Sequence, residues 1–357
     1  MTKSALRDAH EARRCTLAGC VGYNPGIDGG GLMGTVVALS GQVGGAKLAD
    51  GFRRLRGKDL AVIVNTGDDH EVFGLAFSPD IDTMLYTLAG VASPAAGWEP
   101  AGETYALHDM LHRLGSEHRV RVGDRSLALP LLRTEALRAE RTLSQITLDF
   151  CTTLGIDARV LPMSNDPVRT VVVTEEGHVS YHEYLTELEC EPVVKGFLYA
   201  GADVARIPDE VLEALYAPDL EAIVLCPANP YHTIQPILAV QGMRELLRER
   251  GVPVIAVSPI VGDRALKGAA GKMMRELGHE VSARRAALEY YQLIDGFVID
   301  SVDEAAAADI RACAIDVAVA PTIMRSEEDR VALAQVVLDL AGRVRARKVQ
   351  ESASASA

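Results

Sequence analysis

The chain has 357 residues, of which 48% are hydrophobic and 24% are charged, and its formal net charge is −13. This length supports a large core in one α/β domain or in two tightly joined lobes, and the negative charge argues against wholesale binding of nucleic acid. The six cysteines form no CxxC pair, which favours reduced thiols in a cytoplasmic protein, and no apolar run is long enough to span a bilayer.

The two ends of the chain lack the apolar periodicity of a folded element. Residues 1–34 contain several glycines and no sustained apolar period, and the tail 351–357 is mostly alternating Ser and Ala. Such segments cannot bury enough apolar surface to offset the entropy of ordering. We therefore expect disorder in both segments and a single α/β domain over residues 35–350.

Short apolar runs alternate with helical patterns along most of this domain. Buried strands are expected at residues 35–39, 60–64, 170–173, 221–226, 252–257 and 296–299. Helical patterns lie between them, for example at residues 237–250 and 284–293. Strands that alternate with helices predict a Rossmann-like, doubly wound and mostly parallel sheet.

The stretch over about residues 85–186 has a different pattern. Helical periodicity is clearest at residues 101–114, 132–139 and 143–154. This predicts an inserted, mostly helical region that covers one rim of the sheet.

A glycine-rich turn, Ser40-Gly41-Gln42-Val43-Gly44-Gly45-Ala46-Lys47, leaves the first strand. Its spacing is neither that of a dinucleotide fingerprint nor that of a Walker loop, because Leu48 follows Lys47. Glycines let backbone N–H groups approach phosphate oxygens at a partly positive helix N-terminus. The alternative is a tight turn with Lys47 in solvent. The phosphate interpretation assigns Ser40, Gly41, Gly44, Gly45 and Lys47 to phosphate binding.

Four aspartates follow the second strand at short intervals: Asp68, Asp69, Asp80 and Asp82. Mg²⁺ in proteins is usually held by one or two carboxylates together with ligand phosphates. Paired carboxylates also orient a hydroxyl nucleophile or accept its proton. Helix capping is the alternative role. Beside a glycine turn, we expect a metal at Asp68, Asp69 and Asp80 and catalysis by Asp68, Asp69 and Asp82.

Two later strands also end in loops of unusual composition. Pro227-Ala228-Asn229-Pro230 follows one of them, and Ser258-Pro259 follows the next. Ligands of open parallel sheets bind beyond the carboxyl ends of the strands, so these loops are expected to converge with the glycine turn. Taken alone, each is an ordinary proline-containing loop. Together they predict an enzyme that handles a phosphorylated ligand.

In their order along the chain, these motifs resemble the 2-phospho-L-lactate transferases of coenzyme F420 biosynthesis, the CofD-type family. The resemblance runs from about residue 35 to about residue 340. It rests on Leu39-Ser40-Gly41, Val64-Asn65-Thr66-Gly67-Asp68-Asp69, Ser78-Pro79-Asp80-Ile81-Asp82-Thr83, Gly123-Asp124-Arg125, Leu132-Arg133-Thr134, Leu161-Pro162-Met163-Ser164, Pro227-Ala228-Asn229-Pro230 and Val257-Ser258-Pro259-Ile260.

The resemblance implies a Mg²⁺-dependent, homodimeric transferase. Its reaction moves a phosphorylated three-carbon acid from a guanosine diphosphate ester to the ribityl hydroxyl of the deazaflavin Fo and releases GMP. By this resemblance Asn229, Pro230, Ser258 and Pro259 join residues 41–47 around the guanosine diphosphate half, whereas Asp82, Arg121 and Asp124 contact Fo. The acid stays open among phospholactyl, phosphoenolpyruvyl and phosphoglyceryl.

Two other functions share some of these sequence features. Nucleotide-sugar-binding regulatory proteins of a related Rossmann-like family share the glycine turn and an Asp-Asp motif. Their expected Gly and Ser after the aspartates are replaced here by His70-Glu71-Val72-Phe73-Gly74, and Gly123-Asp124-Arg125 is present. A nicotinamide dehydrogenase requires GxGxxG, which the glycine spacing does not supply.

Overall fold

The structure is a computed structural model that describes residues 34–116, 120–265 and 269–355. The N-terminal segment 1–34, apart from Gly34, lies outside the described residues, so its disorder stays a prediction. Within the described ranges, no helix has the length and apolar character needed to cross a membrane.

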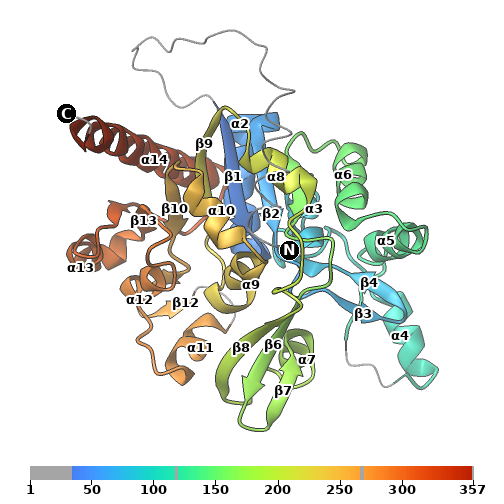
Figure 1. The fold of residues 1–357 in the computed structure, drawn as a ribbon. Coiled ribbons are helices and arrows are strands. Elements are labelled where there is room, and N and C mark those ends of the chain that lie inside the picture. The colour runs from blue at the N-terminus through green and yellow to red at the C-terminus, as the bar shows by residue number, and fades with distance from the viewer. Residues whose placement is uncertain (1–33, 117–119, 266–268, 356–357) are drawn as a thin grey trace. The chain divides into compact units, whose positions relative to one another are not determined.

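A parallel sheet of seven strands forms the centre of the described chain (Figure 1). Its order is β14 (Asp316–Val319), β13 (Gly296–Ile299), β10 (Val254–Val257), β9 (Leu220–Leu225), β1 (Thr35–Ser40), β2 (Leu60–Val64) and β5 (Arg159–Pro162). The chain runs from β1 to one edge and then fills the sheet on the other side of β1. The predicted doubly wound fold is confirmed, and its switch point lies between β1 and β9.

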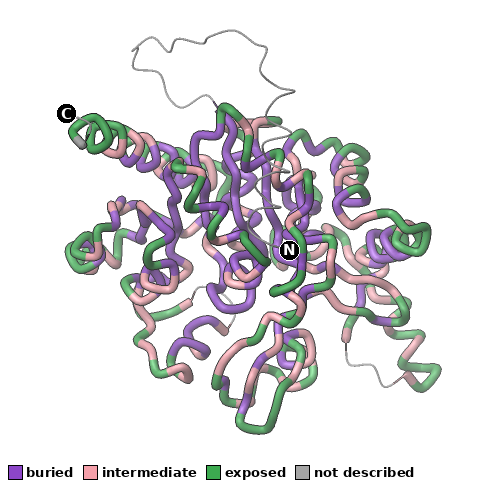
Figure 2. The backbone as a smooth tube through the Cα atoms, viewed as in Figure 1, coloured by how far each residue is buried: buried purple, intermediate pink, exposed green. Residues whose placement is uncertain are grey.

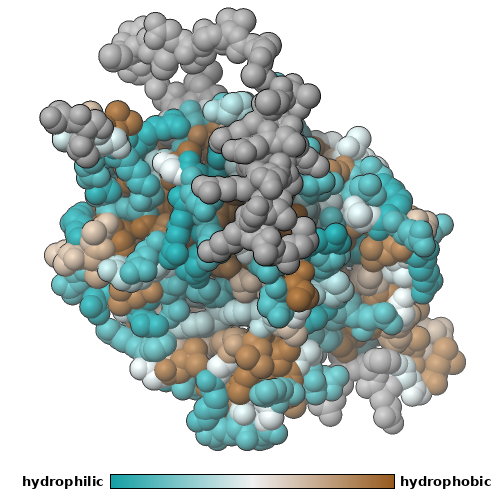
Figure 3. Space-filling view, viewed as in Figure 1, coloured by the Kyte–Doolittle hydropathy of each residue, from teal (hydrophilic) through white to brown (hydrophobic). Residues whose placement is uncertain are grey.

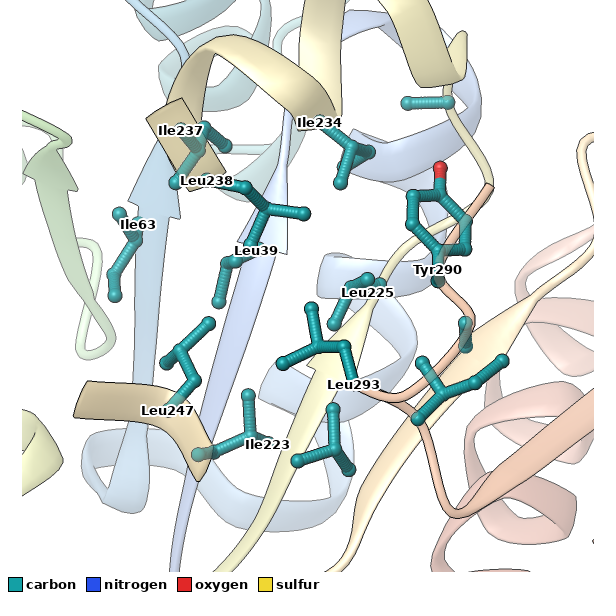
Figure 4. Close-up of a cluster of buried hydrophobic side chains, with 14 of the residues drawn as sticks. Leu39, Ile63, Ile223, Leu225, Ile234, Ile237, Leu238, Leu247, Tyr290 and Leu293 are labelled. Atoms are coloured by element: carbon teal, nitrogen blue, oxygen red, sulfur yellow. The ribbon is translucent and has the colours of Figure 1, made fainter. Parts of the chain in front are cut away.

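Alternating side chains of the buried strands feed two cores, one on each face of the sheet. On one face Val36 and Ala38 pack against α2 (Gln42–Arg56), α3 (Pro79–Leu88), α6 (Leu143–Thr153) and α14 (Glu327–Ala355). On the other face, Val37 and Leu39 pack against α8 (Asp209–Leu215), α9 (Gln235–Ala239), α10 (Met243–Glu249) and α12 (Ala283–Leu288). Figure 2 shows the strands buried along their length, and Figure 4 shows aliphatic side chains converging in the second core.

Smaller elements surround the carboxyl ends of the strands. They comprise the hairpin β3 (His70–Val72) and β4 (Leu75–Phe77), α4 (Ala106–Arg113), α5 (Ala128–Arg138), β6 (Arg169–Thr174), β7 (Gly177–Ser180), α7 (Tyr181–Thr186), β8 (Val194–Ala200) and the π-helical turn η2 (Pro230–Ile234). The remaining short elements are η1 (Gly57–Asp59), β11 (Ile260–Val261), β12 (Arg264–Ala265), α11 (Ala270–Glu276), η3 (Ser301–Ala306) and α13 (Ala307–Arg311). Helix α4 has no buried residue, and Figure 3 shows hydrophobic residues gathered where α4 lies.

Four expectations from the sequence require correction. The strand predicted at residues 170–173 exists as β6, but it belongs to a separate antiparallel sheet of order β7-β6-β8. The segment 85–186 is not wholly an insertion, because its β5 pairs with β2 in the central sheet. The helix predicted over residues 237–250 is interrupted where Gly242 has a left-handed φ of 82°. Helix α14 continues to Ala355, through most of the tail expected to be disordered.

Helix α14 packs closely on α2 because one residue of α2 lacks a side chain. A Cβ on Gly51 would collide with the main-chain carbonyl oxygen of Arg330, whereas a Cβ on Gly342 of α14 would meet nothing within 4 Å. We expect Gly51→Ala to destabilise the protein by about 1–3 kcal/mol through overpacking. Gly342→Ala should stabilise it by up to about 1 kcal/mol through helix propensity. Urea unfolding of both variants tests this, and equal effects would contradict the packing argument.

Candidate functional site

A cavity of about 570 Å³ opens beyond the carboxyl ends of β1 and β2. Three buried aspartates, Asp68, Asp80 and Asp82, reach its wall, from the loop after β2 and from the first turn of α3. The remaining lining residues are mostly apolar or aromatic, including Val43, Phe77, Tyr86, Trp98, Val120, Val122, Tyr181 and Leu185. The cavity thus combines a mostly apolar and aromatic lining with three buried carboxyl groups.

The first turn of α3 explains how two of these carboxylates reach the cavity. Pro79 occupies the start of the helix, where its missing N–H costs nothing, and Asp80 and Asp82 follow in the first turn. Acidic residues at this end are stabilised by the helix dipole. Stabilisation of the helix N-terminus, the alternative role given to these aspartates, is therefore compatible with a position at the cavity wall.

Asp80 connects the glycine turn to the loop after β2. Its Oδ1 accepts a hydrogen bond from the Gln42 N–H at 2.8 Å, and its Oδ2 accepts one from Asn65 Nδ2 at 2.9 Å. Burial, and then the negative charge of Asp68, raise the pKa of Asp80 to about 7. The predicted convergence of the two loops is therefore confirmed at this residue.

One carboxylate oxygen of Asp68 has a hydrogen-bond partner, and the other has none within the described residues. Its Oδ2 lies 3.0 Å from Nδ1 of His232, a residue of η2. Its Oδ1 is buried and has no hydrogen-bond partner within the described ranges. A buried oxygen without a partner at a cavity wall is suited to a cation or a hydroxyl group of a ligand.

Asp82 forms a buried ion pair with Arg133 of α5. Both guanidinium Nη atoms contact the carboxylate, with Nη1 3.3 Å from Oδ2. Burial raises the pKa of Asp82, although the positive charge of Arg133 opposes that rise. The side chain of Arg133, which lies in the motif Leu132-Arg133-Thr134, is fully buried.

Asp69 does not line the cavity. Its Oδ2 accepts a hydrogen bond from the Ser78 hydroxyl at 2.8 Å, and its Oδ1 is buried without a partner in the described chain. Burial raises the pKa of Asp69 to about 8. Of the three predicted metal ligands, the structure therefore brings only Asp68 and Asp80 to the cavity. No group of three His, Cys, Asp or Glu side chains among the described residues could hold a metal alone.

The glycine turn forms the first turn of α2, which begins at Gln42 without a side-chain cap. A Cβ on Gly41 would collide with the Asp80 carboxylate, and one on Gly44 would lie 2.6 Å from the Pro227 carbonyl oxygen. A Cβ on Gly45 would collide with the buried hydroxyl of Ser40. Glycine is thus required here for close packing of the loops, and the N-terminus of α2 lies beside the cavity with the N–H of Gln42 bonded to Asp80.

Several residues predicted to hold the donor have structural partners outside the cavity. Lys47 donates to the Met324 carbonyl oxygen at 2.9 Å. Asn229 caps η2, where its Oδ1 accepts from the Tyr231 N–H and Pro230 is the first residue. Ser258 stabilises its own turn through Ile260, next to Pro259. Of these loops, the one holding Asn229 contacts the cavity lining directly, through Gln42.

The two residues predicted beside Asp82 to contact Fo lie in different environments. Arg121 lines the cavity, and its guanidinium carbon lies 3.6 Å from the centre of the Tyr105 ring. Asp124 is partly exposed and accepts hydrogen bonds from the N–H groups of Ala106 and Leu107 at the start of α4. The structure therefore places Arg121 at the site and gives Asp124 a capping role away from it.

Stacked histidines form a wall that the sequence did not reveal. The rings of His70 and His182 stack at 3.6 Å between centroids, and Phe77 stacks on the other side of His70. Burial and the neighbouring His70 lower the pKa of His182 to about 4. Burial also lowers the pKa of His70, so both rings favour the neutral form at physiological pH. Their positions are far apart in the chain, so no local spacing could have indicated the stack.

The family model described as 2-phospho-L-lactate transferase CofD matches residues 36–337. The chain belongs to the CofD family. A 2-phospho-L-lactate transferase of Methanopyrus kandleri is 37% identical over 308 residues, covering 85% of this chain and 96% of that protein. A phosphoenolpyruvate transferase of Streptomyces griseus is 37% identical over 318 residues, covering 87% and 99%. The protein is therefore an enzyme, a transferase of the CofD kind.

A solved structure of a UPF0052 family protein from Bacillus halodurans shares this fold. The TM-score is 0.59 at 15% identity, and the match covers 85% of this chain and 98% of that one. The likeness supports the α/β fold and carries no information about activity at this identity.

Removal of Arg133 should leave the buried carboxylate of Asp82 without its cation. We expect Arg133→Met to lower the free energy of unfolding by about 3–5 kcal/mol, the usual effect of breaking a buried ion pair. Arg138→Met on the same helix is the matched control, because Arg138 is exposed. Urea denaturation monitored by circular dichroism measures both. A loss no greater than that of the control would show that the pair is unimportant for folding.

The raised pKa of Asp69 predicts the direction in which the stability of the folded protein changes with pH. A carboxyl group whose pKa is near 4 when unfolded and about 8 when folded favours the folded state fully below pH 4, and this contribution is lost as the pH rises to 8. Asp69→Asn should therefore raise the melting temperature relative to the parent protein at pH 8, and the difference should shrink toward pH 4. Thermal unfolding in EDTA across this range tests the prediction. A difference independent of pH would contradict it.

Proposed function

We propose that this enzyme transfers a phosphorylated three-carbon acid from a guanosine diphosphate ester to a hydroxyl group of the deazaflavin Fo, and that GMP leaves. The observation that carries this proposal is the cavity, in which a mostly apolar and aromatic space adjoins buried carboxylates near the N-terminus of α2. A planar ring system fits the first part, and a phosphate with its cation fits the second. The comparisons favour a transferase over a nucleotide-sugar-binding regulator, because the relatives are named as transferases.

The donor's acid is not distinguished by similarity. Relatives named as a 2-phospho-L-lactate transferase and as a phosphoenolpyruvate transferase are both 37% identical to this chain. Phospholactyl, phosphoenolpyruvyl and phosphoglyceryl esters are therefore all candidate donors.

The residues present fit a Mg²⁺ ion held by Asp68 and Asp80. These carboxylates are close enough for the charge of Asp68 to raise the pKa of Asp80, and Asp68 Oδ1 has no partner in the described chain. Two carboxylates with ligand phosphates are a usual Mg²⁺ environment. A bound Mg²⁺ would neutralise charge on the bridging phosphate oxygens.

The chain's own groups perform the remaining tasks. The N–H groups of α2 that follow that of Gln42, which is bonded to Asp80, bind phosphate oxygens, and Arg121 with Trp98 and Phe77 holds the planar ring system. The acceptor hydroxyl oxygen forms a bond to the phosphorus that carries the acid, while the bond to the GMP oxygen breaks. Asp82 accepts the hydroxyl proton, because burial raises its pKa and Arg133 fixes its orientation. Positioning supplies most of the rate enhancement in such transfers.

The reaction itself is tested by following GMP release with purified protein. We expect GMP only when Fo, Mg²⁺ and a suitable guanosine diphosphate ester are all present, because the acceptor hydroxyl displaces GMP. The three esters are assayed side by side, and mass spectrometry identifies the product. Absence of any Fo-derived product with all three esters would remove this proposal.

Asp68→Asn tests the carboxylate that we assign to Mg²⁺ binding, and it leaves the Asp82–Arg133 ion pair intact. We expect transfer to fall by about 100-fold or more, as when a transition-state charge loses its stabilising group. The thermal midpoint should remain close to that of the parent protein. Asp203→Asn, which changes an exposed aspartate, is the matched control. Parent-like activity of the Asp68→Asn variant would exclude Asp68 from the mechanism.

A further inference from the structure

His232 is buried at the switch point of the sheet, with both ring nitrogens engaged. The residue lies in η2 after β9 and is 1% exposed. Its Nδ1 lies 3.0 Å from Asp68 Oδ2, and its Nε2 lies 3.1 Å from Nε2 of Gln42. The imidazole therefore stands between the glycine turn and the carboxylate that faces the cavity. No sequence motif indicated a role for His232.

The neighbours of Gln42 determine which nitrogen of His232 carries the hydrogen. The Asn229 N–H lies 3.1 Å from Gln42 Oε1 and donates to it, so the amide NH₂ of Gln42 must face the imidazole. An NH₂ group donates and cannot accept, so His232 Nε2 accepts through its lone pair. The ring is then neutral, with its hydrogen on Nδ1, and Nδ1–H donates to the carboxylate of Asp68.

Further contacts fix the plane and depth of the ring. Tyr181 stacks on it with centroids 3.8 Å apart and planes inclined by 17°. The main-chain carbonyl oxygen of His232 accepts from Asn65 Nδ2 at 3.1 Å, and the same amide group also donates to Asp80. With its Oδ2 held in this way, Asp68 keeps Oδ1 without a partner in the described chain.

We propose that His232 is a positioning residue that holds Asp68 in its cation-binding orientation, with its tautomer set by Gln42. This inference rests on the proposed function, since it assigns Asp68 to the metal. Gln42 also donates its backbone N–H to Asp80, so one residue of the glycine turn touches the second carboxylate directly and Asp68 through His232. The loop after β9 joins the same chain of contacts through Asn229. The loops after β1 and β9 are thereby linked to both carboxylates.

The tautomer is tested directly in the metal-free protein. Long-range ¹H–¹⁵N spectra of protein labelled with ¹⁵N-histidine distinguish the two neutral tautomers and the imidazolium. His232→Asn identifies the signals of this ring. We expect the neutral Nδ1–H form at neutral pH. An Nε2–H tautomer or an imidazolium would overturn the proposal, whatever the enzyme's activity.

The positioning role is tested with two substitutions of His232 that place a hydrogen-bond donor at different positions. Asn places its amide nitrogen near the position of His Nδ1, whereas Gln places its amide near Nε2. We expect His232→Gln to weaken Mn²⁺ binding by about 10-fold or more, as for loss of a partner that orients a metal ligand. His232→Asn should weaken it by no more than about 3-fold, within the range of a retained orienting contact. Calorimetric titration with Mn²⁺ alone provides the readout.

Controls separate this outcome from general damage and from failure of the proposed function. His178→Gln, at an exposed histidine of β7, should bind Mn²⁺ like the parent protein. Equal Mn²⁺ affinities of the His232→Asn variant, the His232→Gln variant and the parent protein would overturn the positioning role, even if GMP release is observed. Absence of Mn²⁺ binding by the parent protein would also overturn it. If the tautomer and the ordering of affinities hold while no ester yields a product, the proposed reaction fails and the positioning role stands.

Discussion

The two hydrogen bonds accepted by Asp80 hold the site together. One comes from the backbone of the glycine turn after β1, and the other comes from Asn65 after β2. Both loops leave parallel neighbouring strands, so their separation is set by the sheet, and the first turn of α3 inserts the carboxylate between them. The absence of a side chain at Gly41 permits this approach, since a Cβ there would overlap the carboxylate. The buried side chain of Asp80 therefore connects the loops after β1 and β2 with the first turn of α3 at the cavity wall.

The predictable part of the fold is the part with long, uniformly apolar strands. Residues 60–64 and 296–299 are fully buried, and the predicted bounds agree with β2 and β13. Strand β5 contains Arg159 and Pro162 in four residues, so its apolar signal was too short to stand out. An apolar run such as that of β6 predicts a strand, but it does not indicate which sheet the strand joins. Sheet membership depends on partners such as β8, which are distant in the chain.

The predictable part of the site is likewise local in the sequence. Asp68 and Asp80 follow strand ends or helix starts, where polar residues are easily noticed, and both reach the cavity. Arg133, within the motif Leu132-Arg133-Thr134, and His232 were assigned no role in the site, because each meets its aspartate across the fold. Asp124 accepts hydrogen bonds from the start of α4, and its contact with Fo stays a prediction. Burial and pairing, which decide these roles, are properties of the assembled structure.

The electrostatics of the cavity argue for a cation together with an anionic ligand. Burial raises the pKa values of Asp69, Asp80 and Asp82, which means that the surroundings oppose the charged carboxylates. Arg133 stabilises Asp82 by its charge, whereas Asp68 has a hydrogen-bonding contact with His232. A phosphate entering beside these carboxylates would meet repulsion that the N-terminus of α2 offsets only partly. Under the proposed function, a divalent cation held by Asp68 and Asp80 would offset both penalties, because it would neutralise the carboxylates and the phosphate together.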